Sequence, residues 1–277
     1  MRVGFVVDIT ENYKEEIRHA KELGFNLGQL VVWDMDFYTK ENLEGLKKTL
    51  QEEKFEVMSM WCGWTGPVKW GYPDMYQTLG LVPDWMRQKR LEDLRRGAKF
   101  AYDLGIDTIV THVGYTPDDP FDPRRMAMVQ ALKILCAELK ERGQKLAFET
   151  GEEIPLTLSI MIGEIGFDNV GVNFDPANLL CGCRANPNDA MDHLAQRIFG
   201  MHAKDGVAPK FGEVKGRQVQ IGTGEVDFER LIVQLKENGY KGDIAIEHEI
   251  AGVIGAERDK GIKEAKKYIE EIIRRVF

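Results

Sequence analysis

Four side chains that can bind a metal ion or transfer a proton each follow directly after a short apolar run. The runs and the residues that follow them are "KLAF" and Glu149, "VGVNF" and Asp175, "IFGM" and His202, and "DIAI" and Glu247. Two of the four have ordinary structural explanations, because Asp175 before Pro176 could simply start a turn and His202 could be a hydrogen-bonded core histidine. The two glutamates are harder to explain in this way, since a carboxylate that ends an apolar strand is costly to bury without a partner.

The elements that would position these side chains alternate along the whole chain. Eight apolar runs of strand length are separated by segments of helical periodicity, and they lie at residues 3–7, 27–33, 55–61, 107–113, 145–149, 170–174, 198–202 and 243–247. Continuous apolar runs are typical of parallel strands buried on both faces. Eight such units in 277 residues predict an α/β fold, a single-domain (β/α)8 TIM barrel over residues 1–277. An open Rossmann-like sheet is less well supported, because the first strand-to-helix turn, "VVDITENY", lacks the glycine fingerprint for a pyrophosphate.

In a barrel of this kind the chemistry lies at the carboxyl ends of the strands. Glu149, Asp175, His202 and Glu247 would end four consecutive strands, so we expect them to be neighbours around one rim. Three carboxylates and one imidazole would repel one another there unless a cation lay among them. An oxygen-rich ligand set with a single imidazole suits Mn²⁺, Mg²⁺ or Co²⁺, and zinc is also possible. The sequence therefore predicts one divalent metal ion, for which we prefer manganese.

These residues also resemble the signature of a known family. The segments "FETG", "NFDPANL", "MHAKDG" and "IEHE" occur in this order. Each closes a strand, and together they look like the metal-binding motifs of the xylose-isomerase-like TIM barrels, which include sugar phosphate isomerases and epimerases, ketose 3-epimerases, inosose dehydratases and endonuclease IV. The resemblance covers the whole chain. It implies that Glu149, Asp175, His202 and Glu247 ligate one divalent metal, and that Glu149 and Glu247 are also the acid/base pair on opposite faces of a sugar.

The resemblance implies substrate contacts as well. Arg217, in "KGRQVQIGTGE", falls where family members place a substrate-contacting arginine, and His112, in "THVG", ends a strand at a position often used to contact a substrate oxygen. Asn178 departs from the pattern, because several ketose 3-epimerases have histidine three residues after the aspartate. Asn178 therefore leaves the branch of the family open.

Further candidates each have a structural alternative. Trp33 and Trp61 could stack on a sugar, although core packing is the commoner role of tryptophan. Glu152 could contact substrate or be a solvated loop carboxylate. Asp205, three residues past the histidine ligand, is expected to orient that histidine or a nearby lysine, with helix capping as the alternative. Lys204 could neutralise the carboxylates or contact substrate, or it could be a surface residue.

Together these features predict a divalent-metal-dependent sugar isomerase or epimerase, similar to the ketose 3-epimerases. One glutamate would remove a proton next to a carbonyl to give an enediolate, which the metal stabilises as a Lewis acid. Reprotonation on the opposite face by the other glutamate gives epimerisation, and return to the neighbouring carbon gives isomerisation. A dehydratase acting on a keto-sugar or inosose starts from the same intermediate and stays an alternative. The non-enzymatic alternative is a barrel that binds a sugar without catalytic activity.

The composition narrows the partners. A formal net charge of −8 and only five histidines argue against nucleic acid and anionic membrane surfaces as partners. The start "MRVGFVVD" has no signal-peptide pattern, and the four cysteines form no disulfide framework, so we expect a reduced, cytoplasmic protein. The expected partner is a small sugar or sugar derivative. Barrels of this kind often dimerise, so a homodimer is one expectation.

One predicted connection is long enough to cover the site. Residues 63–86, "GWTGPVKWGYPDMYQTLGLVPDWM", follow the third predicted strand and are rich in glycine, proline and aromatic residues. Long loops in compact domains often act as lids over a substrate. A hydrophobic cap packed on the barrel is the alternative of equal weight.

Overall fold

Parallel strands form the centre of the molecule, and their order around it follows the chain. In the computed structural model, which describes residues 1–70, 73–183 and 185–277, eight parallel strands close into a barrel with β1 paired to both β2 and β10. The barrel strands are β1 (Val3–Asp8), β2 (Leu27–Val32), β3 (Glu56–Cys62), β4 (Thr108–Thr111), β5 (Lys145–Glu149), β6 (Val170–Phe174), β7 (Ile198–Ala203) and β10 (Ile244–Ile246). The predicted single-domain TIM barrel is confirmed.

All eight predicted apolar runs form barrel strands of the described chain, because their side chains are buried on both faces. The last strand closes the barrel by pairing Val3 with Ile244 on one side and His202 with Ala245 on the other. The four strands β5, β6, β7 and β10 are consecutive neighbours, so their carboxyl ends meet at one part of the rim.

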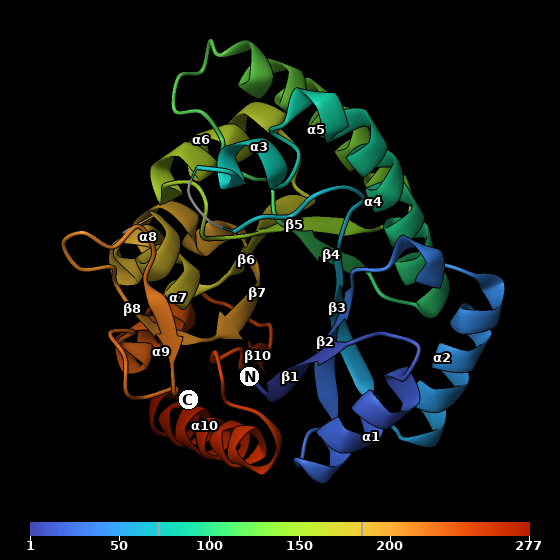
Figure 1. Cartoon of the computed structure of the whole chain (residues 1–277), viewed down its shortest axis with the longest axis vertical. Helices are drawn as coiled ribbons and strands as arrows, with labels where there is room; N and C mark the ends of the chain where they lie inside the picture. Colours follow the sequence, from blue (N-terminus) through green and yellow to red (C-terminus); the bar gives the residue numbers. More distant parts are fainter. Residues whose placement is uncertain (71–72, 184) are drawn as a thin grey trace.

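Helices surround the barrel as an outer layer (Figure 1). They are α1 (Tyr13–Glu22), α2 (Lys40–Glu52), α3 (Met75–Thr78), α4 (Asp84–Leu104), α5 (Pro123–Glu141), α6 (Pro155–Ile165), α7 (Pro176–Asn178), α8 (Pro187–Leu194), α9 (Phe228–Glu237) and α10 (Gly255–Val276). The amphipathic sequences explain this layer, because the longer helices, such as α1, α4, α5, α6 and α10, bury their apolar residues against the strands. Among the described residues, no helix has both the length and the apolar character needed to cross a membrane.

A small hairpin was not predicted from the sequence. Strands β8 (Asp205–Val207) and β9 (Arg217–Val219) pair antiparallel outside the barrel, between β7 and α9. Both strands have three residues and a mixed polar sequence, so they lack the periodicity by which longer strands are recognised. Figure 1 shows the hairpin above α9, beside the barrel opening.

The long connection predicted at residues 63–86 lies between the end of β3 and the start of α4 at Asp84, and it contains the short helix α3. Residues 71–72 of this connection lie outside the described residues. The buried Arg90 of α4 donates hydrogen bonds to the carbonyl oxygens of Thr65 (3.3 Å), Pro67 (3.1 Å) and Gly80 (2.6 Å). The beginning and the end of the connection are therefore both hydrogen-bonded to the side chain of Arg90.

Replacing Arg90 with methionine is expected to lower the free energy of unfolding by about 3 kcal/mol, because three loop carbonyls lose their donor while the aliphatic packing is kept. Equilibrium unfolding in urea measures the loss. The control is Arg96→Met on the same helix as Arg90. It removes one exposed hydrogen bond, to the carbonyl of Met35, and should cost less than about 1 kcal/mol. Equal losses in both variants would show that Arg90 does not organise the connection.

Candidate metal centre

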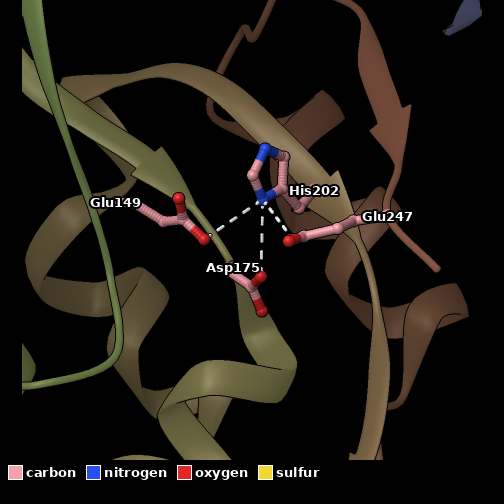
Figure 2. A group of neighbouring side chains, drawn as sticks. All are labelled: Glu149, Asp175, His202 and Glu247. Carbon is pink, nitrogen blue, oxygen red and sulfur yellow. Dashed lines mark hydrogen bonds and ion pairs between the residues drawn. The ribbon is translucent and has the colours of Figure 1, made fainter. Parts of the chain in front are cut away.

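The four predicted metal ligands converge at the carboxyl ends of β5, β6, β7 and β10. Glu149, Asp175, His202 and Glu247 each offer one ligand atom, and these atoms all lie within 4.8 Å of one another. All four side chains are buried, and Asp175 has no exposed surface. Figure 2 shows the three carboxylates pointing at one ring nitrogen of His202, with Glu149 and Glu247 on either side of it.

The distances define a common point close to Nδ1 of His202. This nitrogen lies 3.4 Å from Oε1 of Glu149, 3.4 Å from Oδ2 of Asp175 and 2.8 Å from Oε2 of Glu247. The last contact is an ion pair without hydrogen-bond geometry, and this buried Oε2 has no hydrogen-bond partner among the described residues. A buried carboxylate oxygen without a donor, beside two other carboxylates and an imidazole, fits a divalent cation with oxygen-rich ligation.

Asp175 caps a short helix and also lies at the candidate metal site. Its Oδ1 accepts the backbone N–H of Asn178 (2.8 Å) and so caps the short helix α7, which starts at Pro176. Its Oδ2 faces His202. The turn and the candidate ligand position are therefore compatible, because they use different oxygens of one carboxylate.

Charge strongly affects the protonation of the cluster. Burial alone would lower the pKa of the His202 imidazole, but Glu247 and Glu149 raise this pKa well above its usual value. Burial would likewise raise the pKa of Glu149, but the His112 and His202 imidazoles outweigh it and lower this pKa far below its usual range. Without a metal, a protonated imidazole thus provides the positive charge among the carboxylates.

Binding of a divalent ion at pH 7 is therefore expected to release about one proton, because the ion and the proton compete for Nδ1 of His202. The raised pKa places the imidazole in its protonated form at neutral pH, so the affinity for Mn²⁺ should rise with pH, by up to about tenfold per unit. Calorimetric titration with Mn²⁺ in buffers of different ionisation enthalpy measures the released proton. A binding enthalpy that is the same in all buffers would contradict this assignment.

Gln29 is a residue of the site that the sequence analysis missed. It lies in β2 with 1% exposure, and its Oε1 is 2.9 Å from Nε2 of His202, while its Nε2 donates to Oγ of Ser59 (2.9 Å). An amide oxygen can only accept, so Nε2 of His202 carries a proton. Loss of the second proton, from Nδ1, would then leave the Nδ1 lone pair facing the carboxylates, which is the form that can bind a metal. The signal in the sequence was a single amide inside the apolar run "LGQLVV".

Replacing Gln29 with leucine should weaken Mn²⁺ binding by about 10- to 100-fold, because His202 would lose the acceptor that fixes its tautomer and ring orientation. The dissociation constant from calorimetry is the measurement. Thr111→Val, which removes a buried hydroxyl that bonds to the Cys62 carbonyl in the same barrel, is the matched control and should leave the affinity within about twofold. Equal affinities for wild type and Gln29→Leu would exclude this role.

Lys204 lies beside the cluster, whereas Asp205 does not. The buried Nζ of Lys204 is 3.1 Å from Oε1 of Glu247 and 2.9 Å from Oε2 of Glu249, so it neutralises carboxylates, one of the roles considered for it. Asp205 was expected to orient His202 or Lys204. Its carboxylate instead accepts the backbone N–H groups of residues 206, 222, 224 and 226, at 2.8 to 3.2 Å. This prediction was wrong, because the backbone of the "GTGEV" segment surrounds the side chain and satisfies it.

A cavity of about 560 Å³ opens beside the cluster. Its walls include most of the predicted site residues, namely Trp33, Trp61, His112, Glu149, Asn178, His202, Lys204 and Glu247. Trp70 from the long connection and Lys215 from the hairpin also line it, with Nζ of Lys215 located 5.9 Å from the Trp70 ring. The connection and the hairpin therefore meet at the cavity, which supports a covering role for both.

Two predicted substrate contacts lie elsewhere. Arg217 is exposed on β9 and lines a neighbouring hollow, whereas Lys215, just before β9, lines the main cavity. Glu152 lies behind His112, with its Oε2 2.8 Å from Nδ1, and it lines a small adjoining cavity of about 50 Å³. Burial lowers the pKa of His112, but Glu152 and Glu149 outweigh burial and raise it to about 10.

Asn178 contacts one of the candidate ligands. Its Nδ2 donates to Oε1 of Glu149 (3.0 Å). Gly151 makes this approach possible, because a Cβ there would lie 2.5 Å from Cβ of Asn178, and its φ of +146° is rare for other residues. The residue that departs from the epimerase pattern therefore holds a carboxylate of the cluster.

The closed barrel of parallel strands and the cluster at its carboxyl end define a TIM barrel with a candidate metal site. The sequence profile of the xylose isomerase-like TIM barrel family matches residues 17–272, and the chain belongs to this family. The chain is similar to L-ribulose-5-phosphate 3-epimerase UlaE of Salmonella paratyphi A, with 28% identity over 86% of this chain and 82% of the relative.

Solved structures show the same fold. A xylose isomerase domain protein from Planctomyces limnophilus superposes with a TM-score of 0.88 at 24% identity, covering 99% of this chain and 97% of that one. A xylose isomerase-like TIM barrel protein from Mycobacterium smegmatis in complex with magnesium superposes with a TM-score of 0.73 at 19% identity, covering 95% and 89%.

Proposed function

We propose that the protein is a divalent-metal-dependent isomerase that epimerises a ketose or ketose derivative by proton transfer next to the carbonyl. The observation that carries the proposal is the placement of Glu149 and Glu247 on either side of the common point, each with one oxygen towards it (Figure 2). The similarity to a 3-epimerase of a ketose phosphate supports the same reaction class.

The proposed cofactor is one divalent ion held by Glu149, Asp175, His202 and Glu247. Hard carboxylate oxygens dominate this set, which supports Mn²⁺ or Mg²⁺, with Co²⁺ and Zn²⁺ as further candidates. When bound, such an ion supplies Lewis-acid stabilisation for negative charge on a substrate oxygen. The relative from Mycobacterium smegmatis is described as a complex with magnesium, which supports an ion of this kind.

The protein groups have distinct tasks in this proposal. One glutamate removes the carbon-bound proton, and the other returns a proton to the opposite face of the planar enediolate. The two outer oxygens, Oε2 of Glu149 and Oε1 of Glu247, are the proposed proton carriers, since the inner oxygens face the common point. The ammonium of Lys204 lies 3.1 Å from Oε1 of Glu247 and holds that carboxylate in place.

A screen in deuterated solvent tests the proposal. Protein whose metal content has been measured is incubated with free ketoses, inososes and their phosphates in D₂O, and NMR follows each carbon position. Deuterium at one carbon together with a new epimer or aldose is the expected result. Loss of a hydroxyl group would identify a dehydratase, and binding without any deuterium incorporation would identify a sugar-binding barrel.

A further inference from the structure

The two oxygens of the Glu149 carboxylate are held by different neutral donors. Oε1, on the side of the common point, accepts Nδ2–H of Asn178 at 3.0 Å, and Oε2 accepts the indole Nε1–H of Trp61 at 2.6 Å. The counterpart, Glu247, is held by the Lys204 ammonium. The final torsion of a glutamate side chain is broad, so hydrogen bonds decide how its carboxylate is turned.

Trp61 itself has little freedom to move. It ends β3 with 4% exposure, and its ring packs against those of Trp33 and Trp64 at centroid distances of 4.5 and 5.7 Å. The indole N–H is directed to Glu149, so the ring is fixed by packing on its faces and by a charge-assisted hydrogen bond at its edge. A side chain held in this way positions its partner.

The cluster of Trp33, Trp61 and Trp64 is in turn fixed by the long connection. The guanidinium of Arg90 lies 5.3 Å from the centre of the Trp64 ring, and the same group binds the carbonyls of Thr65, Pro67 and Gly80. Contacts therefore run without a gap from helix α4 through Trp64 and Trp61 to Glu149. The connection that covers the cavity also supports a candidate catalytic carboxylate.

We propose that Trp61 is a positioning residue for Glu149. Its N–H fixes the plane of the carboxylate, so that Oε1 faces the metal and Oε2 faces the substrate. This assignment rests on the proposed function and replaces the sugar-stacking role considered from the sequence. The indole N–H is uncharged and does not titrate, so this donor itself is present at any working pH.

The matched pair Trp61→Phe and Trp64→Phe tests the inference. Both remove an indole from the same cluster, but Nε1 of Trp64 has no hydrogen-bond partner among the described residues and its ring does not line the main cavity. Trp61→Phe should weaken Mn²⁺ binding and lower kcat by about 10- to 100-fold each, with KM within about threefold. Trp64→Phe keeps an aromatic ring between Arg90 and Trp61 and removes no hydrogen bond, so it should change neither quantity by more than about twofold. A rise in KM with unchanged kcat and metal affinity would instead indicate stacking on the sugar and overturn the inference.

A second measurement needs no substrate and no Trp61 variant that folds. The chain has five tryptophans, so ¹⁵N-indole labelling gives few signals, and each Trp→Phe variant that folds assigns one of them. Glu149→Gln should shift the Trp61 Nε1–H resonance and leave that of Trp64 in place. An unshifted Trp61 signal would overturn the inference. The two proposals can also fail separately. If the Trp61 signal shifts in Glu149→Gln and Trp61→Phe binds metal more weakly, but the wild-type protein turns over no sugar, the positioning role is supported and the proposed function is refuted.

Discussion

Replacing Glu149 or Glu247 with glutamine is expected to lower the exchange of the substrate's carbon-bound hydrogen with solvent deuterium by about 100- to 10,000-fold. Glutamine keeps the shape of each side chain and one of its two acceptor oxygens, but it cannot take up the proton from carbon. NMR in D₂O measures the exchange rate. Both variants should stay folded, since the amide oxygen can still accept from Trp61 at position 149.

The control for this experiment is Glu153→Gln. Glu153 lies in the loop that follows β5, and its buried carboxyl group does not line the main cavity. Burial together with Glu152 raises the pKa of Glu153 well above the usual value. Its neutral form resembles an amide, so the substitution should leave the exchange rate within about twofold. Full exchange in both Glu149→Gln and Glu247→Gln would remove the two glutamates from the proposed mechanism.

Removing the divalent ion with a chelator is expected to abolish activity and to destabilise the fold. Restoring Mn²⁺ at about 100 times its dissociation constant should add about 2.7 kcal/mol to the free energy of unfolding, because the ion binds the folded state alone. The physical reason is the cluster of three buried carboxylates, which the ion neutralises. Thermal unfolding with and without Mn²⁺ measures the gain.

Asp175→Asn separates loss of the ion from a general loss of structure. Asparagine can still accept the Asn178 N–H that caps α7, but it removes the charge facing His202. The melting temperature of this variant should respond little to Mn²⁺ or to chelator. A response as large as that of the wild type would show that the stabilising ion binds at another place.

The positions of the four candidate ligands could be predicted because they depend on a simple repeat. Each of Glu149, Asp175, His202 and Glu247 directly follows an apolar run and lies at or next to the carboxyl end of a strand, and parallel strands in a barrel bring such positions to one rim. Buried apolar residues dominate all eight strands, so the hydrophobic pattern alone is enough to locate the strands along the chain.

Other assignments failed where local sequence carries no such repeat. Asp205 lies three residues after His202, but its carboxylate accepts the N–H of the adjacent Gly206 and three backbone N–H groups of the later segment 222–226. Arg217 is close in sequence to Lys215, yet only the lysine lines the main cavity. This difference could not be predicted, because the hairpin is too short to show a sequence pattern. Gln29 lies in the middle of a strand on the far side of the barrel from the expected motifs.

The barrel, the four converging candidate ligands and the reaction class that their chemistry favours could all be predicted from the chain's pattern of residues. How three of these side chains are held became visible only in the folded molecule: the Nε2–H of His202 by Gln29, the outer oxygen of Glu149 by Trp61, and that of Glu247 by Lys204. The difference lies in the range of the interactions. Burial of apolar strands is periodic along the chain, whereas each of these polar contacts joins residues 43 or more positions apart, which only the closed barrel brings within hydrogen-bond distance.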